Sequence, residues 1–91
     1  MEHLNKIIID CTGAAGKQEL HIRIAQALQF PDWYGHNLDA LMDCLTDLPV
    51  TFVVLQGWDT LDAWADGFWE TFRDAQTENP DLQVTFLTKK E

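Results

Sequence analysis

Residues 30–46 read FPDWYGHNLDALMDCLT, and this stretch decides the fold because it carries the end of one helix and the start and apolar face of the next. Pro31 ends the helical pattern that precedes it, and residues 32–35 predict a loop. Asn37 is a plausible N-cap, since its side chain can accept a hydrogen bond from a first-turn amide. The apolar stripe of the following helix consists of Leu38, Leu41, Met42 and Leu45. We therefore expect a helix that the chain enters through an aromatic loop.

The chain upstream of this stretch predicts one strand and one helix. Residues 7–9 are three isoleucines between polar residues, which is typical of a buried strand. Gly13 and Gly16 then mark a turn. Residues 17–29 predict a helix whose apolar positions recur at helical spacing, namely Leu20, Ile24, Ala27 and Leu28.

The chain downstream predicts a strand, a helical stretch and a last strand. Pro49 closes the second helix, and residues 50–55 form an apolar run that indicates a buried strand. Thr60 is expected to cap a helical stretch that Gly67 interrupts and can split in two. The apolar face of that stretch consists of Leu61, Trp64, Ala65, Phe68, Phe72 and Ala75. Apolar and polar residues alternate over 82–86, which predicts a third strand with one wetter face.

The order strand, helix, helix, strand, helix, strand predicts an α/β fold, because parallel strands are joined through right-handed crossovers. We expect a small three-stranded parallel sheet backed by three to four helices. If the strands lie in chain order, all helices cover the same face of the sheet. At 91 residues and 46% hydrophobic content, residues 1–91 are expected to form a single domain with one modest core.

The charge of the chain is strongly acidic and unevenly distributed. The net charge is −9 at pH 7, and no Lys or Arg occurs between Arg23 and Arg73. This excludes a protein that binds the phosphate backbone of a nucleic acid and a polybasic membrane-binding segment. A cationic partner is what such a field favours. The acids between residues 31 and 81 are Asp32, Asp39, Asp43, Asp47, Asp59, Asp62, Asp66, Glu70, Asp74, Glu78 and Asp81.

The sequence offers no motif for catalysis, a metal or a cofactor. Its three histidines stand at no metal-ligand spacing, and Gly-rich phosphate loops and Ser-His-Asp arrangements are missing. Cys11 and Cys44 are expected to be buried thiols, with Cys44 as a nucleophile the alternative. No apolar run approaches the ~20 residues of a membrane helix, and the N-terminal residues lack a signal-peptide core, so we expect a cytoplasmic protein.

Three aspartates of the second predicted helix share one face. Asp39, Asp43 and Asp47 stand at i, i+4 and i+8, about 6 Å apart along the axis, within the ~10 Å Debye length at 0.1 M salt. One interpretation is a solvated face that keeps the protein soluble, and the other is a docking face for cations. The neighbouring Trp33 and Tyr34 also have two interpretations, as core aromatics that pin the loop or as interface anchors.

Residues 30–46 resemble the signature segment of the barstar family, with the pattern Pro-acid-aromatic-Tyr-Gly-x-Asn-Leu-Asp-Ala-Leu-x-Asp-Cys-Leu. A second match is Phe-Arg-Asp-Ala at residues 72–75, where the family has Phe-Arg-acid-Ala. The resemblance covers essentially the whole chain. It implies a three-stranded parallel sheet with helices and an intracellular inhibitor of a secreted microbial ribonuclease, with no enzymatic activity of its own.

The resemblance also implies roles for particular residues. Asp43 corresponds to a carboxylate that occupies the phosphate site of the ribonuclease, and Asp39 and Asp74 to carboxylates that hold an arginine at its mouth. The aromatic residues Trp33 and Tyr34 correspond to side chains that pack over the active-site histidine. The implied partner-binding set is Trp33, Tyr34, Asn37, Asp39, Met42, Asp43 and Asp74.

The chain departs from the family pattern at four places. Met42 and Asp74 stand where barstar has Trp and Glu, and the segment Asp47-Leu48-Pro49 replaces a Gly-Trp pair of its interface. The region of the third helix is also shorter. Two hypotheses follow for a monomeric chain: an inhibitor of a barnase-type ribonuclease, or a non-inhibitory module that uses the same acidic face to bind another basic protein.

Overall fold

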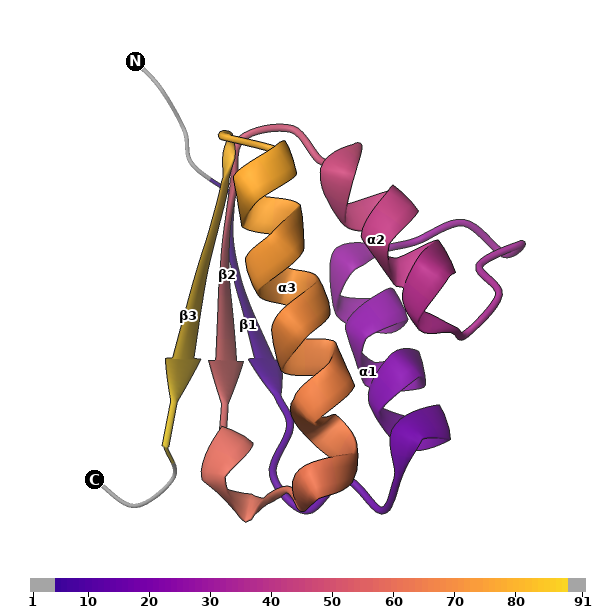
Figure 1. The fold of residues 1–91 in the computed structure, drawn as a ribbon, viewed down its shortest axis with the longest axis vertical. Coiled ribbons are helices and arrows are strands. Elements are labelled where there is room, and N and C mark those ends of the chain that lie inside the picture. The colour runs from indigo at the N-terminus through magenta and orange to yellow at the C-terminus, as the bar shows by residue number, and fades with distance from the viewer. Residues whose placement is uncertain (1–4, 89–91) are drawn as a thin grey trace.

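The computed structural model describes residues 5–88, which form three strands, three α-helices and two short 3-10 helices (Figure 1). The strands are β1 (Asn5–Asp10), β2 (Thr51–Gln56) and β3 (Leu82–Leu87). The α-helices are α1 (Lys17–Leu28), α2 (Leu38–Thr46) and α3 (Asp66–Glu78). The 3-10 helices are η1 (Trp58–Thr60) and η2 (Ala63–Ala65). The predicted domain of residues 1–91 extends beyond these described residues at both ends.

The three strands form a parallel sheet, as predicted from the element order, and they lie in the order β1-β2-β3, which the sequence had left as a condition. The register pairs Val53 of the central strand with Ile7 on one side and Val84 on the other. Figure 1 shows the three α-helices on the same side of the sheet, which follows from two right-handed crossovers between neighbouring strands. The fold is therefore the small α/β fold that the sequence predicts, with a three-stranded parallel sheet covered by helices.

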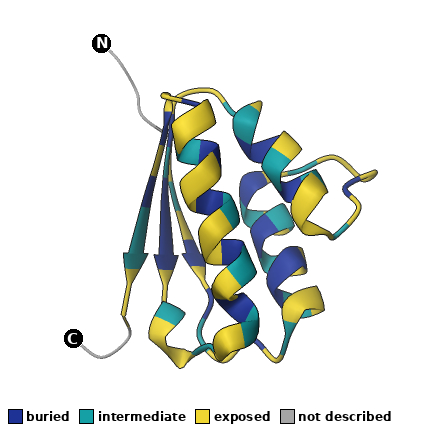
Figure 2. Ribbon diagram, in the orientation of Figure 1, coloured by how far each residue is buried: buried dark blue, intermediate teal, exposed yellow. Residues whose placement is uncertain are grey.

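The core lies between the sheet and the helices. The three strands and the three α-helices all contribute buried residues to this layer, and exposed residues gather on the outer sides of the helices (Figure 2). The largest fully buried side chains are Phe68, Phe72, Leu20, Ile24, Leu41, Leu45, Leu55 and Leu82. Because burial of apolar area is the main favourable term in folding, this cluster fixes α2 and α3 relative to the sheet.

The region between β2 and α3 differs from the prediction. Thr60 does not cap a long helix: its Oγ1 donates to the Gly57 carbonyl at 2.7 Å and accepts from the Gly13 amide at 3.0 Å. It thereby ties the end of η1 to the turn after β1. The helix begins only at Asp66, so Gly67 lies in its first turn and does not split it.

The absence of a side chain at Gly67 lets α2 and α3 approach closely. A Cβ atom at this position would lie 2.9 Å from Leu38 Cδ1 at the start of α2. That distance is shorter than an ordinary carbon–carbon contact of about 3.5–4.0 Å. The glycine therefore brings the two helices together, and with them the carboxylates that they carry.

Candidate functional site

The aromatic loop, residues 29–37, is built from a helix end, a turn and a helix cap. Gln29 ends α1 in the left-handed conformation, at φ 58°, and the Tyr34 amide donates to the Pro31 carbonyl at 3.0 Å. The chain then passes through His36, also at positive φ (53°), into Asn37. These local bonds give the loop a defined path, so its side chains project from a fixed frame.

Asn37 is the N-cap of α2, as predicted. Its Oδ1 accepts from the Ala40 amide at 2.8 Å, and its Nδ2 donates to the Gly35 carbonyl at 3.3 Å. The residue is exposed, so its amide group lies at the surface while it holds the helix start. Its role as a polar contact for a partner stays a prediction.

Replacing Asn37 by alanine is expected to lower the free energy of unfolding by about 1 kcal/mol, because the Ala40 amide loses its acceptor. Aspartate at this position should retain most of the stability, since its carboxylate can accept the same bond. Urea denaturation followed by circular dichroism measures the difference. An alanine variant as stable as the parent would show that the cap contributes nothing.

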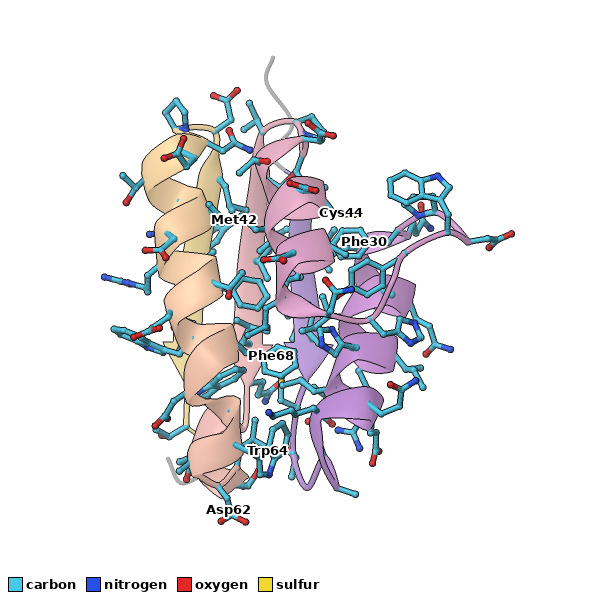
Figure 3. All side chains as sticks on the ribbon, turned by 45° about the vertical axis from the view of Figure 1, so that its right-hand side comes forward. Phe30, Met42, Cys44, Asp62, Trp64 and Phe68 are labelled. Atoms are coloured by element: carbon cyan, nitrogen blue, oxygen red, sulfur yellow. The ribbon has the colours of Figure 1, made fainter. Side chains whose placement is uncertain are left out.

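The carboxylates of α2 line its outer surface. Asp39, Asp43 and Asp47 are all exposed, opposite the buried residues Leu41 and Leu45. Met42 is half-buried and packs against the core; Figure 3 shows it on the side of α2 that faces α3. The aligned carboxylates that the spacing predicts are therefore present on an accessible helix face.

Asp74 is exposed on α3, the helix that packs beside α2. It stands seven residues after Gly67, which is two helical turns along the flank that touches Leu38. Because the two helices lie side by side (Figure 1), Asp74 adds its charge to the same side of the molecule as Asp39. We name Trp33, Asn37, Asp39, Met42, Asp43 and Asp74 the acidic face.

The two aromatic residues of the loop have different environments. Trp33 is 75% exposed, whereas Tyr34 is only 6% exposed and its hydroxyl lies 2.7 Å from His21 Nδ1. For Tyr34 the structure therefore supports the core interpretation. The contact with a partner's histidine that the resemblance implies for both residues stays a prediction, and in the free protein the Tyr34 ring is covered and its hydroxyl is engaged.

Sequence reasoning missed a buried histidine beneath the loop. His21 is 4% exposed, stacks with His36 at 6.1 Å between ring centroids and contacts the Phe68 ring at 4.6 Å. The signal was available, since position 21 lies seven residues before Leu28 and so falls on the apolar stripe of α1. His21 and Tyr34 support the loop from below through one hydrogen bond.

We expect the free energy of unfolding to decrease as the pH is lowered, because of His21. Burial lowers its pKa from 6.5 to about 4, and the His36 imidazole acts in the same direction. Between these two values the unfolded chain binds a proton that the folded chain excludes. The contribution is therefore complete above pH 6.5 and is lost as the pH falls towards about 4, by about 3 kcal/mol in all.

Urea denaturation of the parent and of a His21→Gln variant at pH 7.5, 6, 5 and 4 measures this contribution. The glutamine can keep a hydrogen bond to Tyr34 but does not titrate. The unfolding free energy of the parent should decrease relative to that of the variant as the pH is lowered from 6.5 towards about 4. A constant difference would show that His21 is protonated equally in the folded and unfolded states.

Both thiols are buried and reduced, as predicted. Burial raises the pKa of Cys11 to about 12. For Cys44, burial and then the Asp43 and Asp47 carboxylates raise the pKa above its usual range. Since the thiolate is the reactive form, neither environment activates a nucleophile.

Side chains that commonly bind metals are dispersed over residues 5–88. These residues contain no group of three or more His, Cys, Asp or Glu side chains that could hold a metal ion. No helix among them is long and apolar enough to cross a membrane.

The fold and this surface define a small acidic α/β protein with carboxylates displayed on two adjacent helices. Residues 4–89 match the family described as Barstar (barnase inhibitor), so the chain belongs to the barstar family. A Bacillus subtilis (strain 168) protein named "Putative ribonuclease inhibitor YrdF" is 42% identical over 85 residues, covering 86% of this chain and 92% of that protein.

Proposed function

We propose that this protein inhibits a basic microbial ribonuclease by placing the acidic face over the active site of the enzyme. The observation that carries the proposal is the exposed carboxylate of Asp43, set on α2 between Asp39 and Asp47 and beside the helix that bears Asp74. Membership of the barstar family and the name of the Bacillus subtilis relative support a ribonuclease inhibitor in general.

The proposed mechanism is imitation of the substrate by carboxylates. A ribonuclease binds phosphate groups with cationic side chains, and carboxylate oxygens accept the same charge-assisted hydrogen bonds. Asp43 takes the phosphate site, and Asp39 and Asp74 hold an arginine at its mouth. Trp33 covers the active-site histidine, while Asn37 supplies a polar contact. The inhibitor is not itself cleaved, because it contains no phosphodiester bond.

The net charge supports the same partner. A protein with a net charge of −9 attracts a basic enzyme over distances of about a Debye length, which accelerates their association at low salt. Barnase with barstar is the reference case for such steering. We also propose that the chain acts as a monomer in the cytoplasm, where it would protect cellular RNA.

A titration of the protein into a barnase-type ribonuclease tests the proposal. RNA cleavage should fall in proportion to added protein and stop near one equivalent. An Asp39→Asn/Asp43→Asn double variant should leave cleavage unchanged at the same concentrations. Full enzyme activity at micromolar excess of the parent protein would contradict inhibition of that enzyme.

The altered segment after α2 favours a second candidate function. Asp47, Leu48 and Pro49 replace a Gly-Trp pair of the family interface, which changes the border of the acidic face. The chain can then serve as a non-inhibitory module for another basic protein. Affinity purification from the host lysate separates the two, because only the inhibitor should recover a nuclease.

A further inference from the structure

A small cavity lies beside the acidic face, between the aromatic loop and the last turn of α2. Its volume is about 220 Å³, and its walls include Phe30, Pro31, Trp33, Cys44, Asp47 and Leu48. Figure 3 shows Phe30 and Cys44 together in the space between α2 and the loop. The volume is below the roughly 300–1,000 Å³ of small-molecule sites, so it suits one side chain of a partner.

Trp33 forms one wall of this cavity and has an open ring. Its side chain is 75% exposed, and it takes part in no ring stacking or cation–π contact within residues 5–88. The other exposed tryptophan, Trp69 at 44%, differs because Arg73 lies 5.5 Å from its ring centroid. Trp33 thus offers an open indole face of the kind that Arg73 contacts at Trp69.

Asp47 supplies a negative charge to the cavity. It is the C-cap of α2, at the negative end of the helix dipole, and the last turn of α2 carries no basic side chain. A carboxylate at this position is unfavourable for the isolated helix. A cation placed here is attracted both by the carboxylate and by the helix end. Among the cavity walls, Asp47 is the charged residue.

We propose that Trp33, in addition to its contact with the active-site histidine, forms with Asp47 a binding site for an arginine side chain of the basic partner, separate from the positions of Asp39, Asp43 and Asp74. A guanidinium group is flat and weakly hydrated, so it can stack on the Trp33 indole and donate two hydrogen bonds to the Asp47 carboxylate. Lysine offers no flat surface and only a point charge. This site rests on the proposed function, because it extends the same interface.

The site makes Asp47 a residue that determines partner choice. A ribonuclease with an arginine opposite the cavity gains a contact, and one with an acidic or bulky group there loses affinity. The arrangement also explains why the chain keeps a carboxylate where the helix dipole disfavours one. Asp47 then lowers the stability of the free protein and strengthens the complex.

A peptide titration tests the site without any ribonuclease. Acetyl-Gly-Arg-Gly-amide is added to the isotope-labelled protein, and the Trp33 indole and Asp47 amide signals are followed by NMR. We expect saturable shifts at millimolar peptide for arginine, weaker shifts for the lysine peptide and none for the uncharged citrulline peptide. Asp47→Asn and Trp33→Ala should each abolish saturation. Equal shifts at all exposed carboxylates would overturn the proposal, because they would indicate charge screening alone.

The ribonuclease complex gives the second readout. Asp47→Asn should weaken binding about tenfold, whereas Glu70→Gln, which removes the same charge from an exposed position on α3, should change it less than twofold. The urea midpoint of Asp47→Asn should equal or exceed that of the parent. Equal affinity losses for both variants would overturn the site. If no ribonuclease binds at all, the inhibitor proposal fails while the peptide result still decides the arginine site.

Discussion

Replacing Asp43 by alanine is expected to weaken binding to the target ribonuclease by about 2–5 kcal/mol, or 30-fold to several thousand-fold. Asp43 is exposed in the free protein and lies in the middle of the α2 carboxylates. In the complex its removal leaves cationic groups of the enzyme buried without a partner, and this penalty dominates the loss. The range comes from charge pairs of the kind measured in barnase and barstar and is carried over to this chain.

Isothermal titration of parent, Asp43→Ala and Glu70→Ala proteins against the same enzyme measures the effect. Glu70 is exposed on α3 and carries no role in the acidic face, so its loss should reduce affinity slightly through long-range charge alone. The loss at Asp43 should appear mainly as faster dissociation. Similar losses at both positions would mean that net charge, and not the α2 face, determines binding.

Replacing Phe72 by alanine is expected to lower the free energy of unfolding by about 3–5 kcal/mol. The side chain is fully buried and packs against Phe86 of β3 at 6.2 Å between ring centroids, edge to face. Its removal leaves a cavity between α3 and the sheet that neighbouring side chains fill only in part. Since small domains have total stabilities of about 5–15 kcal/mol, this variant should be near its folding limit.

Urea denaturation at pH 7.5 measures the loss, with Trp69→Ala as the control. Trp69 lies on the same helix and also contacts Phe86, at 6.2 Å, but its side chain is 44% exposed. Its replacement should cost less than half as much, because less apolar area leaves the core. Equal costs at the two positions would contradict the assignment of Phe72 to the core.

Much of the fold could be predicted because hydrophobic periodicity and burial agree along most of the chain. The apolar runs at residues 7–9 and 50–55 became parallel strands, of which β2 is largely buried as predicted, whereas Ile8 of β1 is 56% exposed because the helices cover only one face of the sheet. Asn37 was recognisable as a helix cap from its side-chain chemistry. The parallel pairing followed from the rule of right-handed crossovers, while the order β1-β2-β3 was only assumed and is given by the structure. These features depend on local sequence or on general rules of connection.

Features set by tertiary contacts could not be predicted. Thr60 has the chemistry of a cap, but its hydroxyl is used by Gly13, 47 residues away. The sequence leaves Tyr34 open between a core and an interface role, and the core contact is visible only once its hydroxyl lies beside His21 on another helix. In each case a partner distant in sequence determined the outcome, and no local pattern carries that information.

The candidate site shows the same division. The alignment of Asp39 and Asp43 follows from a helical spacing of four residues, so it was predictable. Asp74 joins them because α2 and α3 pack side by side, and Asp47 faces a cavity that the loop creates. The spacing therefore predicted that Asp39 and Asp43 share one face of α2. Which residues of α3 and of the loop lie beside that helix could be seen only in the structure.

Competition for the ribonuclease active site tests the central claim most directly. The affinity of this protein for a barnase-type enzyme is measured by titration with the active site free and then saturated with a mononucleotide 3′-phosphate. If the acidic face occupies the phosphate site, the apparent Kd rises in proportion to the nucleotide concentration divided by its own Kd. An apparent Kd that stays constant at nucleotide saturation would contradict the account, because the protein would then bind elsewhere on the enzyme.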